Sequence, residues 1–130
     1  MINCKFRAWD KNRRELCKVS SIEFNDGNIC WIEVVNSDNV LRRLYPTQFE
    51  INQSSNIRDN SSEDKYIYEE DTVKFVYENN SYTGVVRFEL GSFIITSNEL
   101  DDGYIIMSDI VNTDGDYNWI CGTITGNTYL

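Results

Sequence analysis

The segment of residues 66–77 constrains the fold more than any other, because an acidic turn runs there directly into an alternating pattern. Apolar side chains recur at every second position, at Val73, Phe75 and Tyr77. Successive side chains of an extended chain point to opposite faces, so these three side chains share one face. The pattern predicts a β-strand that turns one side to a hydrophobic core.

Two further segments repeat this pattern. Residues 82–88 place Gly84 among apolar side chains on one face, and residues 92–96 follow after a turn. A glycine inside a strand indicates a bulge or a sharp bend. The three segments predict an antiparallel meander. Shorter apolar segments follow at residues 104–107, 110–111 and 118–124. Strands of this length are typical of a small barrel of the SH3-like kind.

The N-terminal half predicts two hairpins. Residues 5–10 alternate between polar and apolar side chains, and a charged turn leads to residues 16–19. Residues 21–24 and 29–35 flank an Asn-Asp-Gly-Asn turn, in which Asp-Gly suits the positive backbone angles of a tight hairpin. Residues 29–35 are apolar on both faces, so we expect this strand to be covered on both sides or to lie in a subunit contact.

Two segments interrupt the strand patterns. The segment of residues 40–51 is the first. Asp38 or Asn39 is expected to cap a brief helical turn over residues 40–44, which Pro46 ends, with a strand as the alternative. Residues 53–65 are almost entirely polar and predict a mobile loop.

A chain of 130 residues fits one domain. We divide it into an N-terminal β region (1–52), the polar loop (53–65) and a C-terminal barrel-like region (66–130). The predicted fold class is mostly β, either all-β or α+β, with an N-terminal hairpin region, an SH3-like barrel and few or short helices.

The net charge of −9 is distributed unevenly. The first twenty residues carry six bases and two acids, whereas the remaining residues carry six bases and nineteen acids, a net charge of −13. An acidic body repels phosphates, which disfavours nonspecific binding to nucleic acid. Opposed charges favour head-to-tail contacts between copies, so a homo-oligomer is one interpretation, and a charged surface that only keeps the protein soluble is the alternative. No segment has the length of a membrane span or the pattern of a signal peptide, so we expect a cytoplasmic protein without a membrane partner.

The residue types argue against catalysis and against a bound cofactor. The chain has no histidine, and its four cysteines form no C-x-x-C pair, so we predict no zinc site, no catalytic residue and no cofactor. The cysteines are expected to be reduced core residues, with a disulfide as the alternative. Glu69, Glu70 and Asp71 are interpreted as a solvated turn in preference to a metal site, because neighbouring residues of an extended chain rarely converge. Asp114-Gly115-Asp116 is likewise interpreted as a turn and not a calcium loop.

Three residues are candidates for binding a partner. Arg7 and Trp9 share a face of residues 5–10, and if Phe6 packs inward they point outward. Arginine beside an exposed tryptophan is typical of partner-binding surfaces. Trp31, in the strand that is apolar on both sides, is the third candidate. The alternative is a strand buried on both sides, with Arg7 paired to an acid.

Three separated motifs resemble the YopX-like proteins of bacteriophages and prophages. Residues 5–10 read K-F-R-A-W-D, residues 67–74 correspond to an I-Y-E-G-D-x-V-K motif, and residues 120–130 correspond to I-G-N-I-Y-E-N-P-E-L. The chain differs from the pattern at Glu70, which replaces glycine, and at Thr128, which replaces proline. If that glycine served a left-handed turn, Glu70 would strain it by roughly 1–2 kcal/mol. The resemblance implies a small, mostly β protein in the cytoplasm of a bacterial host, without an activity to carry over.

Three functions therefore stay open. The first is a noncatalytic, self-associating protein-interaction module with an unknown protein partner. The second is an acidic inhibitor that mimics nucleic acid toward a host DNA-binding enzyme. The third is a weak binder of single-stranded nucleic acid through aromatic stacking.

Overall fold

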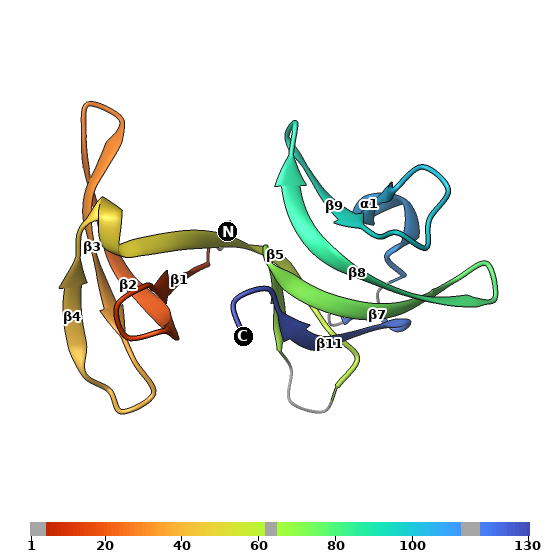
Figure 1. The fold of residues 1–130 in the computed structure, drawn as a ribbon, viewed down its shortest axis with the longest axis horizontal. Coiled ribbons are helices and arrows are strands. Elements are labelled where there is room, and N and C mark those ends of the chain that lie inside the picture. The colour runs from red at the N-terminus through yellow and green to blue at the C-terminus, as the bar shows by residue number, and fades with distance from the viewer. Residues whose placement is uncertain (1–4, 62–64, 113–117) are drawn as a thin grey trace. The chain divides into compact units, whose positions relative to one another are not determined.

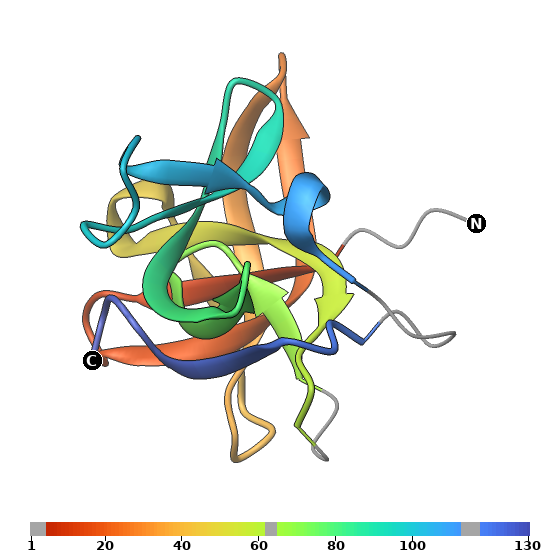
Figure 2. The same ribbon diagram turned by 90° about the vertical axis from the view of Figure 1, so that its right-hand side faces the viewer.

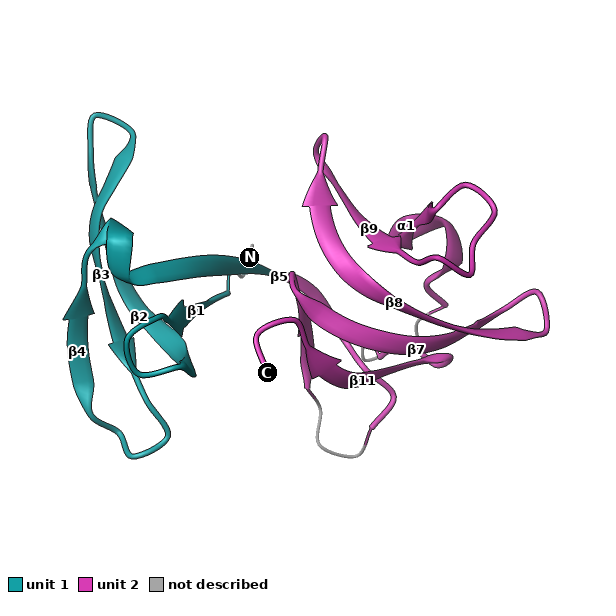
Figure 3. Cartoon of the chain, viewed as in Figure 1, with its two compact units in different colours: residues 1–53 teal, residues 54–130 magenta. Residues whose placement is uncertain are grey.

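The computed structural model describes residues 5–61, 65–112 and 118–130, and the chain forms two compact units, Met1–Gln53 and Ser54–Leu130 (Figures 1 and 3). Both units are built from antiparallel strands, with only short helices in the described segments. The predicted mostly β fold is confirmed. Within the same segments, no helix is long and apolar enough to cross a membrane.

Unit 1 is a sheet with the order β4-β3-β2-β1-β5. Its strands are β1 (Phe6–Asp10), β2 (Glu15–Asn25), β3 (Asn28–Val35), β4 (Leu41–Leu44) and β5 (Phe49–Arg58). Both predicted hairpins are confirmed. Asp26 and Gly27 join β2 to β3 with φ angles of 51° and 82°, as a primed hairpin turn requires. The core of this unit consists of Ala8, Cys17, Ile32, Val34, Leu44 and Phe49.

The helical turn expected after residue 39 is wrong, because residues 41–44 form β4 and pair with β3. The side-chain oxygen of Asn36 accepts hydrogen bonds from the backbone N–H groups of Asp38 (2.9 Å) and Val40 (3.0 Å). The Asn-Ser-Asp-Asn segment is therefore a turn between strands and not a helix cap. A short 3₁₀ helix, η1 (Pro46–Gln48), leads into β5.

The loop expected over residues 53–65 is wrong for its first part, because β5 continues to Arg58 and crosses from unit 1 into unit 2. Its last residues pair with β6 (Tyr66–Tyr68). Ser54 is buried, and the Ser55 hydroxyl donates to the Ile67 carbonyl at 2.8 Å. These polar side chains bond to the backbone instead of filling an apolar core. Residues 62–64 of the expected loop lie outside the described residues.

Unit 2 contains a second sheet with the order β10-β9-β8-β7-β11. The strands are β7 (Asp71–Tyr77), β8 (Asn80–Glu89), β9 (Ser92–Thr96), β10 (Tyr104–Ile106) and β11 (Gly122–Asn127). The predicted meander is confirmed as β7-β8-β9, and β8 is visibly curved (Figure 1). Figure 2 shows the short helix α1 (Met107–Ile110) directly after β10, at a position where strands were expected.

The core of unit 2 gathers the residues that alternate along these strands. It consists of Ile67, Val73, Phe75, Val86, Ile95, Met107 and Trp119. Gly84 lies opposite Val73 in a continuous register, so the bulge expected there is absent from the β7–β8 ladder. A Cβ atom at Gly84 would lie 2.5 Å from a methyl carbon of Ile95, which explains the glycine by close packing. Closure of this sheet into an SH3-like barrel stays a prediction.

Candidate functional site

The outer face of β3 and β4 in unit 1 carries an arginine stacked on a tryptophan. The Arg43 guanidinium lies 3.8 Å from the centre of the Trp31 ring. Glu33 is directly opposite Arg43 in the β3–β4 ladder and accepts a hydrogen bond from it at 3.3 Å. Tyr45 follows β4 and is 50% exposed. We refer to Trp31, Glu33, Arg43 and Tyr45 as the Trp31 face.

The alternation of the strands creates this face. Ile32 and Leu44 are paired and point into the core, so their neighbours Trp31, Glu33 and Arg43 point to the opposite side. Hydrogen bonds to Glu33 and then to Tyr45 raise the pKa of Arg43, so the cation persists at every physiological pH. The face thus presents a permanent charge and two aromatic rings in a fixed arrangement.

Sequence reasoning identified Trp31 but missed Arg43 and Tyr45. The cause is the helical turn expected over residues 40–44, which would have spread these side chains around a helix. Their spacing of two residues was the available signal, since two residues is the period of one strand face.

Arg7 and Trp9 do not form an exposed pair. Trp9 is 6% exposed, and the Arg14 guanidinium lies 5.7 Å from the centre of its ring. The Arg7 side chain donates to the buried amide oxygen of Asn52 at 3.0 Å. The outward orientation expected for Trp9 is therefore not observed, and Arg7 bonds to an amide in the neighbouring strand.

The acid that ends the K-F-R-A-W-D motif has a structural position. Asp10 is 1% exposed and accepts hydrogen bonds from the backbone N–H groups of Asn12 and Arg13. Its other oxygen lies 2.6 Å from a terminal nitrogen of Arg42, which also bonds to Glu15 at 2.9 Å. A buried carboxylate needs such partners, so this network holds the β1–β2 turn closed.

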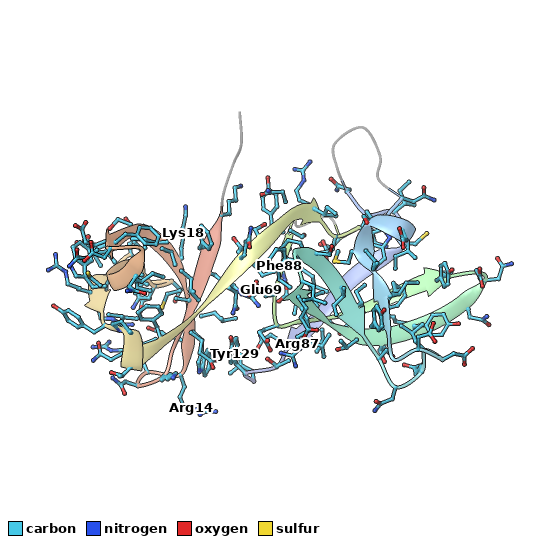
Figure 4. The ribbon with its side chains drawn as sticks, turned by 90° about the horizontal axis from the view of Figure 1, so that it is seen from above. Arg14, Lys18, Glu69, Arg87, Phe88 and Tyr129 are labelled. Atoms are coloured by element: carbon cyan, nitrogen blue, oxygen red, sulfur yellow. The ribbon has the colours of Figure 1, made fainter. Side chains whose placement is uncertain are left out.

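The acids in the turn of the I-Y-E-E-D segment also bond to neighbouring groups of the fold. Glu70 has a φ of 70°, its carboxylate pairs with Arg87, and it accepts a hydrogen bond from the Thr128 hydroxyl at 2.5 Å. The buried Asp71 accepts a bond from the Tyr68 N–H at 2.8 Å. Figure 4 labels Arg87, the partner of Glu70, together with Glu69 and Tyr129, the chain neighbours of Glu70 and Thr128.

The side chains of the two acid clusters do not converge on one point in the described part of the chain. Across residues 5–61, 65–112 and 118–130, no group of three or more acids and cysteines is placed to hold an ion. The oxygens of Glu70 and Asp71 instead bond to different partners. Cys17, Cys30 and Cys121 are free thiols, and Cys17 is buried in the core of unit 1. The expected turn at residues 114–116 and Cys4 lie outside the described residues.

Comparison with known proteins agrees with this fold. A family model described as "YopX protein" matches residues 5–127. The fold is similar to the crystal structure of the protein yopX from Bacillus subtilis, with a TM-score of 0.64. The two sequences are 17% identical, and the match covers 98% of this chain and 94% of that chain. Protein EF1440 from Enterococcus faecalis is 18% identical, with a TM-score of 0.60 over 99% and 95%. A search of curated proteins found no match. The chain belongs to the YopX protein family.

Proposed function

We propose that this protein is a noncatalytic, phage- or prophage-encoded interaction module. Its Trp31 face serves both for self-association and for binding to a host protein. The observation that carries the proposal is the stacked pair of Trp31 and Arg43 beside the exposed Tyr45. Tryptophan, tyrosine and arginine are the residues most enriched where protein interfaces gain their binding energy. A rigid strand pair also presents them at little cost in conformational entropy.

The sequence supports a binding role over a catalytic one. Without histidine, general acid-base chemistry near neutral pH would need a carboxylate, lysine or thiol with a strongly shifted pKa. Of the described cysteines, Cys17 has a raised pKa, because burial and then the charge of Glu15 disfavour its thiolate. Such a thiol is a poor nucleophile at neutral pH.

Charge distribution supports self-association. The exposed bases Lys11, Arg13 and Arg14 lie together in the β1–β2 turn of unit 1. The rest of the chain carries the excess of acids, so the basic turn of one copy attracts an acidic surface of another and adds to the contact that the Trp31 face makes. Such contacts form rings or chains of copies, depending on whether the rotation closes.

Affinity capture from lysates of phage-infected bacteria tests the host-protein part of the proposal. We compare the wild-type protein as bait with Arg43→Gln and with the matched control Lys74→Gln, which removes one exposed positive charge from unit 2. We expect a specific host protein to be retained by the wild type and by the control and to be lost with Arg43→Gln. Equal retention by all three baits would contradict a role for the Trp31 face.

The two alternative functions receive less support from the side chains. A mimic of nucleic acid needs free, regularly spaced carboxylates, but Asp10, Asp59 and Asp71 are buried and Glu70 is paired with Arg87. A stacking platform for single strands needs open aromatic faces, whereas Trp9 and Trp119 are buried and Arg43 covers Trp31.

A further inference from the structure

The short strand β10 forms one edge of the sheet in unit 2. Its only strand partner among the described residues is β9. The Ser97 N–H donates to the Gly103 carbonyl at 3.0 Å, so residues 103 and 97 are a hydrogen-bonded pair. In an antiparallel ladder such pairs alternate, so Ile105 bonds toward β9, while the N–H and C=O groups of Tyr104 and the N–H group of Ile106 point to the outer edge. The carbonyl of Ile106 serves the first turn of α1, because Ile106 is the N-cap residue of that helix.

An apolar groove lies beside this edge, on the sheet face that Ile94, Tyr104 and Ile106 share. It has a volume of about 380 Å³ and is lined by Glu89, Leu90, Ser92, Ile94, Tyr104 and Ile106. Leu90 is fully exposed at the tip of the β8–β9 hairpin, and Tyr104 is 51% exposed. Tyr104 and Ile106 share one face of β10 with the outward-pointing backbone groups between them. A strand added beside β10 would therefore meet a hydrogen-bonding group and an apolar side chain at every second residue of β10.

The surroundings of the groove are acidic. Glu89 lines it, and the exposed Asp101 and Asp102 lie immediately before β10. Arg87 lies opposite Ile94 in the β8–β9 ladder, but its guanidinium is paired with Glu70. If the β10 strands of two copies paired, the acidic groups beside each strand would repel one another. The same acidic groups attract a basic segment.

We propose that β10 is a binding site for an extended, basic segment of another protein, which adds to the sheet as a further strand with alternating apolar and basic side chains. Its backbone bonds to Tyr104 and Ile106, its apolar side chains enter the groove, and its lysines or arginines meet Glu89, Asp101 and Asp102. This mode of recognition takes affinity from main-chain bonds and specificity from alternate side chains. It uses unit 2 and is independent of the Trp31 face.

Amide hydrogen exchange of the full chain, measured by NMR with a capped peptide of alternating valine and lysine, tests the proposal. We expect saturating peptide to slow exchange about tenfold at the amides of Tyr104 and Ile106, because both gain an acceptor. Ile105 already faces β9 and serves as the internal reference. A peptide of the same composition with its valines and lysines in separate blocks carries the same charge and should leave both amides unchanged.

Charge variants provide the second arm of the test. The triple variant Glu89→Gln, Asp101→Asn, Asp102→Asn should raise the Kd of the alternating peptide about tenfold, as three partly screened contacts would. The matched variant Glu23→Gln, Asp26→Asn, Asp38→Asn removes the same charge from unit 1 and should leave the Kd unchanged. Equal weakening by both triples, or unchanged exchange at Tyr104 and Ile106, would overturn the proposal. Protection of these amides that rises with protein concentration alone would assign the edge to a second copy and would also overturn it.

Discussion

Glu70 stands at the position where the YopX-like motif has glycine, and its backbone angle φ is positive. Its φ of 70° lies in the left-handed region, where a side chain other than glycine is strained. The residue remains there because four bonds hold it: its N–H donates to Val86, its carbonyl accepts from the Thr128 N–H, and its carboxylate meets Arg87 and the Thr128 hydroxyl. These contacts hold Glu70 in a conformation that glycine adopts without strain.

Comparison of Glu70→Gly with Glu70→Ala isolates the backbone strain. Both variants lose the carboxylate, but only alanine keeps the restriction on φ, so we expect the glycine variant to be more stable by about 1 kcal/mol. Urea denaturation of the two variants measures the difference. A glycine variant no more stable than the alanine variant would show that the turn relaxes to another conformation.

Asp59 is a buried acid that stabilises unit 2 through hydrogen bonds alone. One oxygen accepts from the Ser61 N–H and hydroxyl, and the other accepts from the Ile124 N–H at 3.1 Å. An asparagine here would replace one accepting oxygen with an NH₂ group, which cannot accept a hydrogen bond from the Ser61 or Ile124 groups. Asp59→Asn should therefore lower the free energy of unfolding by about 2 kcal/mol. The exposed Asp102→Asn is the control and should change stability by less than about 0.5 kcal/mol. Equal losses in thermal or urea melts would contradict this role.

Cys17 gives the protein an alkaline limit of stability. Burial, followed by the charge of Glu15, raises the pKa of this thiol above 9.0, its ordinary value. The folded state favours the protonated thiol. The contribution of this thiol to the free energy of unfolding is therefore complete below pH 9.0, its pKa in the unfolded chain, and is lost as the pH rises through the pKa of the folded state. Urea denaturation at a series of alkaline pH values should show a decline in stability that Cys17→Ala reduces. A decline of the same size in both proteins would contradict the assignment.

At the scale of single elements, the sequence predicted what local chemistry determines. The Asp26-Gly27 turn and the alternation of Val73 and Phe75 need no distant partner, and both were predicted correctly. The second half of β5 could not be predicted, because its buried side chains are polar. Ser55 satisfies a backbone group that only the fold brings near, the carbonyl of Ile67, whereas Ser54 accepts a hydrogen bond from the nearby Asn56 N–H.

The candidate site was predictable in part for the same reason. Trp31 stands out as an aromatic residue in an apolar strand. Arg43 becomes its neighbour only because residues 41–44 pair with β3, and this tertiary pairing overrides the local tendency toward a helical turn. The burial of Trp9 likewise depends on the folded surroundings of β1.

Strand β11 contains a glycine that packing requires. A Cβ atom at Gly122 would lie 2.0 Å from a ring carbon of the buried Trp119, whereas one at Gly126 would lie 3.2 Å from the hydroxyl of Thr72. Gly122→Ala should therefore lower the free energy of unfolding by about 3 kcal/mol, since the ring cannot move in a filled core. Gly126→Ala, in the same strand, should lower it by less. Calorimetric melting of both variants measures this order, and the reverse order would contradict the packing account.

At the scale of the whole molecule, our proposals place one binding surface on each of the two β units. Unit 1 presents an arginine stacked on tryptophan, and unit 2 presents an acidic, apolar sheet edge. The match to the YopX family over residues 5–127 spans both units. That the two units fold as a single domain stays a prediction.

Self-association through the Trp31 face is the central claim at this scale. Truncation of a tryptophan at an interface commonly costs about 2 kcal/mol, so Trp31→Ala should weaken association about 30-fold. Because the contact also depends on opposed charges, added salt should weaken it in the wild-type protein. Lys74→Gln changes an exposed side chain in unit 2, away from the face, and serves as the control.

Sedimentation equilibrium of the wild type, Trp31→Ala and Lys74→Gln across the micromolar range tests this claim most directly. We predict that the wild type and Lys74→Gln form concentration-dependent oligomers over the same range, while Trp31→Ala associates only at concentrations about 30-fold higher. A wild-type protein that stays strictly monomeric, or a Trp31→Ala variant that associates as strongly as the wild type, would contradict it.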